Sequence, residues 1–248
     1  MTLEQFFAEN REVAIAFSGG VDSAYLLYAA KRYAARVKAY YVSTAFQPEF
    51  ELADARRLAD ELGADMLVLH VDVLSNSAVT ANPSDRCYHC KNTLFRQILR
   101  AAENDGFPVL LDGTNASDDA GDRPGMRALR ELSVRSPLRE CGLTKAEIRR
   151  LSREAGLFTW DKPAYACLAT RIRTGEEITL QKLKQTEKAE GFLFGLGLRD
   201  FRVRMVGNTA KLELRETDLP LLLENREKVV TELHKDYDSV LLNLEVRK

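Results

Sequence analysis

Short apolar runs alternate with helical segments through the first half of this sequence. The runs cover residues 13–17, 37–42, 65–71 and 108–115, and segments with helical spacing lie between them. A short, continuous apolar run is typical of a parallel strand that is buried on both faces of a sheet. Strands and helices that alternate in this way form βαβ crossovers and one parallel sheet. We therefore expect an α/β fold with a doubly wound parallel sheet, in which ligands bind beyond the carboxyl ends of the strands.

The pattern changes in the last third of the chain. Residues 143–156 still predict a helix that begins with a capping box of Thr144 and Glu147, whereas residues 160–177 have neither period and are typical of an ordered functional loop. A small α+β unit follows, with its expected elements at 180–195, 201–206, 210–214, from Asp218, and 240–246. We expect a nucleotide-binding domain over residues 1–175 and a small α+β domain over 176–248 that binds substrate and supports self-association.

The composition excludes several classes of protein. Lys and Arg number 36 and Asp and Glu 37, a balance that argues against stable binding to nucleic acid. No apolar run approaches the roughly 20 residues that a membrane span needs, and the first 17 residues do not resemble a signal peptide. We expect a cytoplasmic protein, in which the four cysteines serve metal or redox chemistry more often than structural disulfides.

The segment "SGGVDS", residues 18–23, connects the first predicted strand to a helix. Gly19 and Gly20 permit a tight turn that brings backbone N–H groups close to an anion, and the helix N-terminus favours negative charge. The hydroxyls of Ser18 and Ser23 can donate hydrogen bonds, and Asp22 can hold Mg²⁺ against phosphate oxygens. Neither GxxxxGK[ST] nor GxGxxG is present. The pattern predicts a polyphosphate site; the alternative is a tight turn with Ser18 as a helix cap.

Three of the cysteines suggest a metal centre. Cys87 and Cys90 form a CxxC motif just before a predicted helix, which is typical of a redox pair or half of a metal site. Together with Cys167 they fit a [4Fe–4S] cluster with three protein ligands and one iron open to an external ligand. Zinc completed by His89 or Cys141 is the competing interpretation, and two reduced thiols packed under a loop is the third.

The segment 18–23 resembles the PP-loop of the ATP pyrophosphatase superfamily, whose fold is that of the adenine nucleotide alpha hydrolases. This resemblance implies an enzyme that uses ATP to adenylate a carboxylate, carbonyl or urea-like oxygen and releases pyrophosphate. The loop would hold the β- and γ-phosphates and leave the α-phosphate open to attack, so catalysis would rest on positioning and charge neutralisation.

Five segments together resemble one family of this superfamily, the LarE-type sulfur transferases. They are "AFSGGVDS", "DRCYHCK", "LLDGTNASDD", "RSPL" and "KPAYACLATR". The family resemblance implies that the chain adenylates a carboxylate of pyridinium-3,5-biscarboxylic acid mononucleotide and converts it to a thiocarboxylate. That reaction serves the nickel-pincer cofactor of lactate racemase.

The resemblance also implies a set of site residues. The catalytic residues would be Cys167, Asp22 and Lys162, and Asp22 would hold Mg²⁺. The residues that bind ATP would be Ser18, Gly19, Gly20, Asp22, Ser23, Ser43, Gly113, Thr114 and Asn115. The [4Fe–4S] ligands would be Cys87, Cys90 and Cys167. Asp118, Asp119 and Asp122 crowd one loop, which either completes the Mg²⁺ site or is an acidic surface loop.

Three arginines are candidates for binding the substrate. Arg171 flanks Cys167 and can neutralise a phosphate or lower the pKa of a thiol. Arg202 and Arg204 alternate on one predicted strand, so their side chains point to the same face and can receive a phosphate through bidentate contacts. A solvated basic strand face is the alternative for this pair.

Two routes to sulfur and several rival functions stay open at this point. In one subgroup of the family, the cysteine that matches Cys167 gives up its own sulfur and becomes dehydroalanine. In another subgroup, three cysteines hold a cluster that carries sulfide, and the presence of Cys87 and Cys90 favours this route. The rival functions are an amidating ligase of the NAD or GMP synthetase kind, a tRNA thiolase, and an ATP-sensing module that holds zinc. We expect a homo-oligomer supplied by a sulfide donor.

Overall fold

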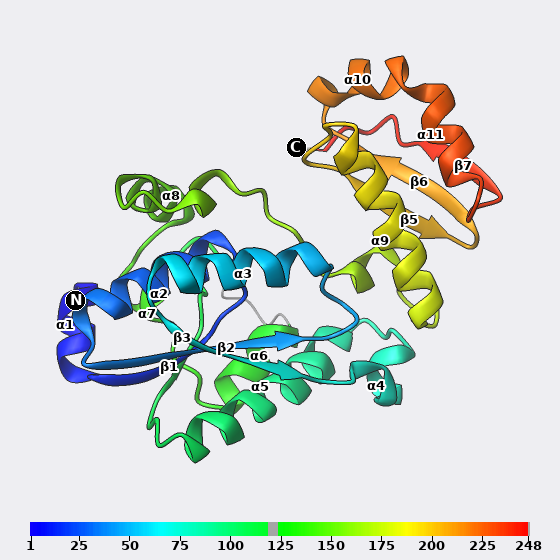
Figure 1. Ribbon diagram of the computed structural model, residues 1–248. Helices are drawn as coiled ribbons and strands as arrows, with labels where there is room; N and C mark the ends of the chain where they lie inside the picture. The colour runs from blue at the N-terminus through cyan, green and yellow to red at the C-terminus, as the bar shows by residue number, and fades with distance from the viewer. Residues whose placement is uncertain (119–123, 248) are drawn as a thin grey trace. The chain divides into compact units, whose positions relative to one another are not determined.

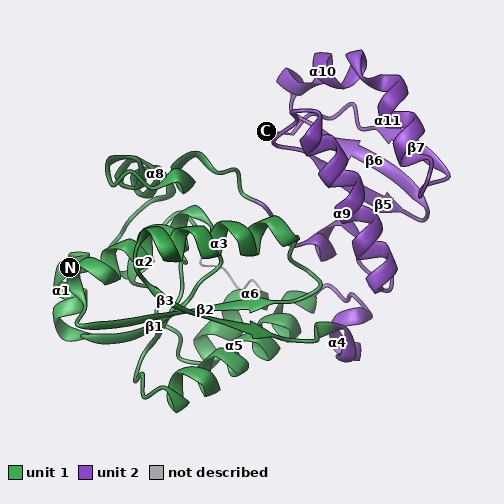
Figure 2. Ribbon diagram, in the orientation of Figure 1, with its two compact units in different colours: residues 1–73, 85–164 green, residues 74–84, 165–248 purple. Residues whose placement is uncertain are grey.

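A computed structural model describes residues 1–118 and 124–247, so Asp119 and Asp122 of the acidic loop lie outside the described residues. The chain divides into two compact units, which Figure 2 shows in different colours. Unit 1 comprises residues 1–73 and 85–164, and unit 2 comprises residues 74–84 and 165–248.

Unit 1 is built on a parallel sheet of four strands in the order β3-β2-β1-β4 (Figure 1). The strands are β1 (Glu12–Ala16), β2 (Arg36–Ser43), β3 (Asp65–His70) and β4 (Leu110–Leu111). The helices are α1 (Leu3–Glu9), α2 (Val21–Tyr33), α3 (Glu49–Glu61), α5 (Arg86–Asn104), α6 (Pro124–Glu131), α7 (Pro137–Glu140) and α8 (Lys145–Glu154), with a 3₁₀ turn η2 (Phe158–Asp161). The α/β fold with a parallel sheet, expected from the alternating pattern, is confirmed.

Both faces of this sheet are covered. Val13 and Ile15 of β1 face a core that contains α2, while Ala14 of the same strand faces a second core with Ile98 of α5. Helices α2 and α3 lie on one side of the sheet and α5 on the other (Figure 1). Burial on both faces is the reason why the strand is apolar at every position rather than at alternate ones.

Two boundaries in unit 1 differ from the sequence expectation. The strand expected at 108–115 has only two residues, and beside them Arg135 donates its backbone N–H to the Leu110 carbonyl at 3.0 Å and accepts from Asp112 N–H at 2.9 Å. The CxxC motif lies within the first five residues of α5 rather than before the helix. The capping box at the start of α8 is confirmed, since Thr144 and Glu147 each accept from the other's backbone N–H.

Unit 2 contains a second sheet in the order β5-β6-β7, antiparallel between β5 and β6 and parallel between β6 and β7. Its strands are β5 (Arg202–Val206), β6 (Thr209–Glu213) and β7 (Ser239–Leu242). Its helices are α4 (Ser77–Thr80), α9 (Leu180–Gly195), α10 (Leu219–Glu224) and α11 (Arg226–Leu233), with 3₁₀ turns η3 (Leu168–Arg171) and η4 (Glu216–Asp218); η1 (Val73–Ser75) lies where the chain first enters the unit.

The short stretch 74–84 belongs to unit 2 because it is bonded to the segment after Cys167. Gly175 N–H donates to the Asn82 carbonyl and Ile178 N–H donates to the Thr80 carbonyl, each at 2.8 Å. The buried Asn82 side chain donates to the Arg173 carbonyl at 2.8 Å. No local pattern in the sequence indicates this connection.

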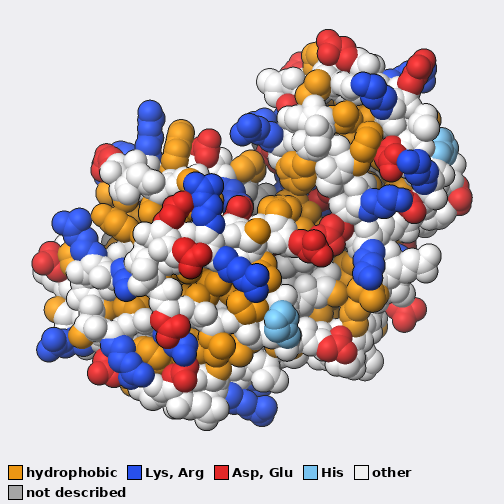
Figure 3. Space-filling view, in the orientation of Figure 1, with side chains coloured by type: hydrophobic (Ala, Val, Ile, Leu, Met, Phe, Trp, Pro, Cys, Tyr) orange, Lys and Arg blue, Asp and Glu red, His pale blue; other side chains and the backbone are white. Residues whose placement is uncertain are grey.

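The surface agrees with the balanced composition. Lys and Arg side chains are interspersed with Asp and Glu side chains over the face that Figure 3 shows. Among the described residues, no helix has both the length and the apolar character that crossing a membrane requires.

Candidate active site

The loop between β1 and α2 is fixed by hydrogen bonds of its own hydroxyls. Ser18 and Ser23 place their Oγ atoms 3.0 Å apart, and Ser23 Oγ donates to the Gly20 carbonyl at 3.2 Å. Gly20 is the N-cap of α2 and supplies no side-chain acceptor to the first turn. The N–H groups at the start of α2 therefore remain available for an anion, and the helix dipole favours one there.

Two glycines let neighbouring segments approach this loop closely. Gly19 has a φ of +71°, and a Cβ on it would lie 3.1 Å from the Cβ of Ala55 on α3. A Cβ on Gly113 would lie 2.9 Å from the backbone nitrogen of Ser23. The loop after β4 is thus pressed against the first turn of α2, which joins two of the predicted ATP-binding segments in one place.

Asp22 lies where these segments meet. Its Oδ2 is 2.6 Å from Nζ of Lys145, and its Oδ1 accepts from Nδ2 of Asn115 at 3.4 Å. Burial raises the pKa of Asp22, and the hydrogen bond and charge of Lys145 offset part of that rise. The site therefore already pairs the predicted Mg²⁺ ligand with a cation.

Lys145 is a site residue that the sequence analysis missed. It is the first residue of α8, and its backbone N–H donates to Oγ of Ser117 at 2.9 Å. The predicted capping box at Thr144 gave the start of the helix. It gave no information on which strand end that start would face, because this depends on tertiary packing.

The loop after β4 is ordered by its own polar side chains. Buried Asp112 accepts from Thr114 Oγ1 at 2.5 Å and from Ser136 Oγ at 2.6 Å. Asn115 is also buried, and its backbone N–H donates to Oδ2 of Asp118 at 2.8 Å. Asp112 therefore fixes the loop, and the amide of Asn115 is the group that it presents to Asp22.

Ser43 and Lys162 are placed by separate elements of unit 1. Ser43 ends β2 at the carboxyl edge of the sheet, where its carbonyl accepts from Val71 N–H at 3.0 Å. Lys162 places its Nζ 2.6 Å from Oδ2 of Asp54, and its side chain is only 15% exposed. Because Asp54 precedes Ala55, the same turn of α3 contacts both Lys162 and the glycine loop.

Cys87 and Cys90 lie three residues apart within the first five residues of α5, so their side chains share one face of the helix. Cys87 is exposed and Cys90 is half-buried. A helix N-terminus favours the thiolate form that ligates metals. His89 is 3.3 Å from Asp85, and Cys141 lies at the end of α7. The described residues contain no group of three His, Cys, Asp or Glu that could hold a metal ion.

Cys167 and the predicted substrate-binding arginines belong to unit 2. Arg171 lies inside the unit and donates to Glu190, an arrangement that the prediction of a substrate-binding role did not foresee. Arg202 is also buried, and burial lowers its pKa together with the nearby charges of Arg171 and Arg247. Arg204 is more exposed and pairs with Glu213 at 2.7 Å.

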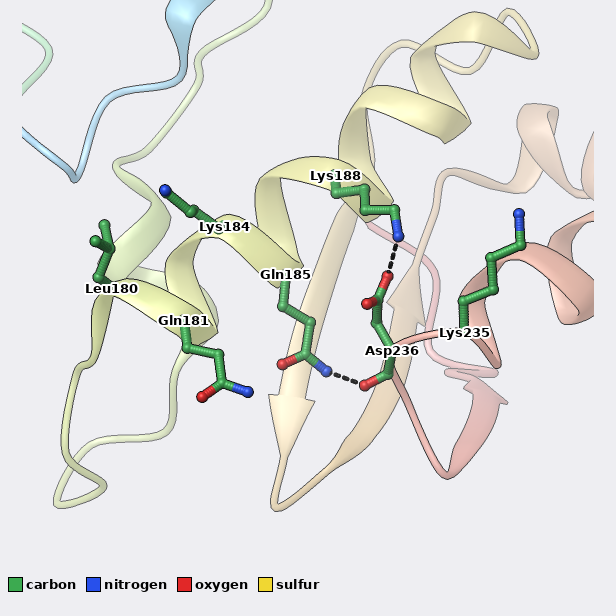
Figure 4. Close-up of a pocket in the computed structure, with 7 residues that line it drawn as sticks. All are labelled: Leu180, Gln181, Lys184, Gln185, Lys188, Lys235 and Asp236. Atoms are coloured by element: carbon green, nitrogen blue, oxygen red, sulfur yellow. Dashed lines mark hydrogen bonds and ion pairs between the residues drawn. The ribbon is translucent and has the colours of Figure 1, made fainter.

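A groove of about 590 Å³ on unit 2 contains none of the predicted site residues. Its lining residues are Leu180, Gln181, Lys184, Gln185, Lys188, Lys235 and Asp236 (Figure 4). Asp236 bridges its two sides: Lys188 of α9 lies 2.6 Å from the carboxylate, and the Gln185 amide donates to the backbone carbonyl.

The chain is similar in sequence to a known family and to several curated proteins. Residues 4–119 match a family model described as asparagine synthase. The chain is 40% identical over 86% of its length to the uncharacterised protein slr1717 of Synechocystis, and the match covers 80% of that protein. It is 30% identical over 96% of its length to the uncharacterised protein MJ0830 of Methanocaldococcus jannaschii, and the match covers 91% of that protein. It is 33% identical over 87% of its length to the pyridinium-3,5-bisthiocarboxylic acid mononucleotide synthase of Lactiplantibacillus plantarum, covering 79% of that enzyme. The chain belongs to the LarE-type sulfur transferases.

This LarE-type chain is therefore an ATP-dependent sulfurtransferase with an adenylating PP-loop domain. ATP and Mg²⁺ are the cofactors that such a domain uses. The donors present fit Mg²⁺, because Asp22 offers a carboxylate beside the helix N-terminus that would receive phosphate.

The sequence predicts a catalytic role for Lys162, and on that prediction we expect Asp54→Asn to lower the turnover of this LarE-type enzyme by about tenfold, because Lys162 loses the carboxylate that positions it. The partly exposed ion pair should change the free energy of unfolding by no more than about 1 kcal/mol. Steady-state kinetics and thermal unfolding measure the two effects. Asp60→Asn, on the exposed face of the same helix, is the control. Unchanged turnover in Asp54→Asn would show that this contact does not position a catalytic group.

Proposed function

We propose that this chain converts a carboxylate of pyridinium-3,5-biscarboxylic acid mononucleotide to a thiocarboxylate. A carboxylate oxygen attacks the α-phosphorus of ATP and displaces pyrophosphate, which gives an acyl adenylate. Sulfide then attacks the carbonyl carbon, and AMP leaves with the former carboxylate oxygen. The identity to the named synthase of L. plantarum carries the substrate assignment, and the glycine loop with Asp22 supports the first step.

In this proposal, the residues of unit 1 bind and orient ATP. The N–H groups at the start of α2 receive the β- and γ-phosphates, and Asn115 fixes the carboxylate of Asp22. When Mg²⁺ is bound it neutralises phosphate charge, and Asp22 would hold it. Lys145 exchanges its contact with Asp22 for one with phosphate, so no charge is left without a partner.

We further propose that unit 2 binds the mononucleotide and supports self-association. Arg204 offers a guanidinium near Cys167, since its Nη1 donates to the Thr170 carbonyl at 2.6 Å. Arg202 lies on the same face of β5, two residues away. Both would contact the phosphate of the substrate through charge-assisted hydrogen bonds.

For sulfur delivery we propose the cluster route. Cys87 and Cys90 form a half-site on one face of α5, and Cys167 would supply the third ligand to a [4Fe–4S] cluster. When bound, such a cluster would hold sulfide on its open iron. Sacrifice of the Cys167 sulfur is the second candidate, because this cysteine serves either route.

The test combines metal content with product formation. Anaerobically purified protein should contain about four irons per chain, and Cys87→Ser and Cys167→Ala should each lose them. Cys141→Ser is the matched control and should keep the wild-type content. ATP and the biscarboxylic mononucleotide should yield pyrophosphate and a thiocarboxylate. Absence of iron after reconstitution, with loss of the mass of H₂S from Cys167 after turnover, would replace the cluster route with the sacrificial one. Absence of pyrophosphate release would contradict the proposed function itself.

A further inference from the structure

A buried ion pair in unit 2 joins Glu190 to Arg171, which follows Cys167 by four residues in the sequence. The side chains of Arg171 and Glu190 are each 1% exposed, and Arg171 Nε is 2.7 Å from Glu190 Oε1. Arg171 is the last residue of η3, and Glu190 lies in the middle of α9. Neither the sequence motifs nor the comparisons draw attention to Glu190.

Glu190 accepts hydrogen bonds from η3, from β5 and from the loop that precedes η3. Its Oε1 accepts from Arg171 Nε and from the backbone N–H of Val203 on β5 at 2.9 Å. Its Oε2 accepts from Arg171 Nη2 at 3.1 Å and from the hydroxyl of Tyr165. One carboxylate therefore ties the loop that carries Cys167 to both α9 and β5.

Arg171 continues the network to the backbone on either side of the cysteine. Its Nη1 donates to the Ala166 carbonyl at 3.0 Å and to Thr170 Oγ1 at 2.8 Å. Thr170 in turn donates to the Cys167 carbonyl through its backbone N–H at 2.9 Å and through Oγ1 at 2.8 Å. The carbonyls of two successive residues, Ala166 and Cys167, are thus held by one network that extends from the buried ion pair.

Burying this pair is hard to explain by stability alone. Removing two charges from water is costly, and well-packed apolar residues often replace a buried ion pair without loss. The planar guanidinium, by contrast, supplies several donors in a fixed geometry that an apolar side chain cannot imitate. Here each of its three nitrogens is used, two of them on Glu190 and one on the cysteine loop.

We propose that Arg171 and Glu190 are positioning residues that fix the backbone of the sulfur-handling Cys167. The role of Cys167 in sulfur transfer rests on the proposed function, whereas the positioning of its backbone does not. Tyr165 is the third member of this network, because its hydroxyl completes the Oε2 contacts of Glu190. Arg171, which the sequence suggested as a contact for the substrate, would thus act by positioning Cys167.

The test follows the cysteine loop in the nucleotide-free protein. In Glu190→Gln, amide hydrogen exchange over residues 166–172 should rise by about fivefold or more, the effect of losing one net hydrogen bond. Alkylation of half-buried Cys167 by iodoacetamide, read by peptide mass spectrometry, should accelerate by a similar factor. Arg171→Lys should behave in the same way, because an ammonium cannot reach all of these acceptors.

Control variants separate positioning from general destabilisation. Asp236→Asn removes the ion pair that Asp236 forms with Lys188 of α9, the helix that also carries Glu190. Leu233→Ala removes a buried side chain from α11. In both variants the alkylation rate of Cys167 should stay within about twofold of the wild-type rate, although Leu233→Ala lowers the melting temperature. If Glu190→Gln is poorly folded, Tyr165→Phe keeps the ion pair and should give a smaller increase of the same sign.

A second measurement links the network to turnover. Glu190→Gln should retain pyrophosphate release and lose thiocarboxylate formation, because ATP binds in unit 1 and the sulfur step needs Cys167. Unchanged exchange and alkylation in Glu190→Gln, Arg171→Lys and Tyr165→Phe would overturn the positioning proposal. Failure of the wild-type chain to release pyrophosphate would overturn the proposed function and leave the exchange result intact.

Discussion

Asp22→Asn is expected to slow ATP-dependent pyrophosphate release by a factor of about 10² to 10³, the usual cost of removing one electrostatic group from a transition state. The amide keeps the shape of the side chain but cannot neutralise Mg²⁺ or Lys145. Folding should survive, because the pair is partly exposed and its contribution to the free energy of unfolding is about 1 kcal/mol or less. A coupled pyrophosphate assay over a range of Mg²⁺ concentrations measures the effect.

Lys145→Gln is the partner experiment. If Lys145 neutralises phosphate after ATP binds, this variant should weaken the binding of ATP in calorimetry and retain the dependence on Mg²⁺. Lys31→Gln, an exposed lysine at the other end of α2, should bind ATP like the wild type. A normal rate in Asp22→Asn at all Mg²⁺ concentrations would place the metal on other residues.

Gly113→Ala is expected to lower the same rate by about a hundredfold, since a displacement near 1 Å in an active site has an effect of this size. The added methyl group would lie 2.9 Å from the Ser23 nitrogen and 3.2 Å from the Ser23 Cα. Both are backbone atoms, which cannot rotate away as a flexible side chain would. The loop after β4 and the start of α2 must therefore separate, and the overpacking should cost about 1–3 kcal/mol of stability.

Gly191→Ala is the matched control for this substitution. Gly191 lies within α9, and a Cβ there meets no atom within 4 Å. Replacing a helical glycine by alanine should stabilise the protein by about 0.5–1 kcal/mol and leave catalysis unchanged. Binding of ATP by Gly113→Ala with the wild-type affinity would show that the close approach of the two loops is not needed for the nucleotide site.

The sheet could be predicted from the sequence because it depends on local patterns. A continuous apolar run such as residues 13–17 has few structural interpretations when a glycine turn and a helical segment follow it. The capping box of Thr144 and Glu147 could be predicted for the same reason, since its two residues lie within four positions of each other. The length of β4 could not be predicted from the sequence, because Asp112, just past the end of the strand, bonds to Arg135, a partner that is distant in sequence.

The site was predictable in part, for the same reason. The glycine loop is recognisable from six consecutive residues, whereas Lys145 contacts Asp22 across 123 residues of sequence. Arg171 was visible beside Cys167, but its ionic partner lies on another helix, and nothing in the local pattern distinguishes Glu190 from an exposed glutamate. Long-range pairs between charged side chains are decided by packing, which a single sequence does not display.

The bonding of residues 74–84 to unit 2 constrains how this molecule can be divided. The chain enters unit 2 at residue 74, returns to unit 1 at residue 85 and enters unit 2 again at residue 165. A single cut does not separate the two units, because a fragment that ends at residue 164 keeps the stretch 74–84 of unit 2 without the carbonyl of Arg173 and the N–H groups of Gly175 and Ile178 that bond it. Recombination between related genes at one junction would likewise separate bonded partners. An exchange of unit 2 between two related proteins would therefore have to replace both of its segments, 74–84 and 165–248.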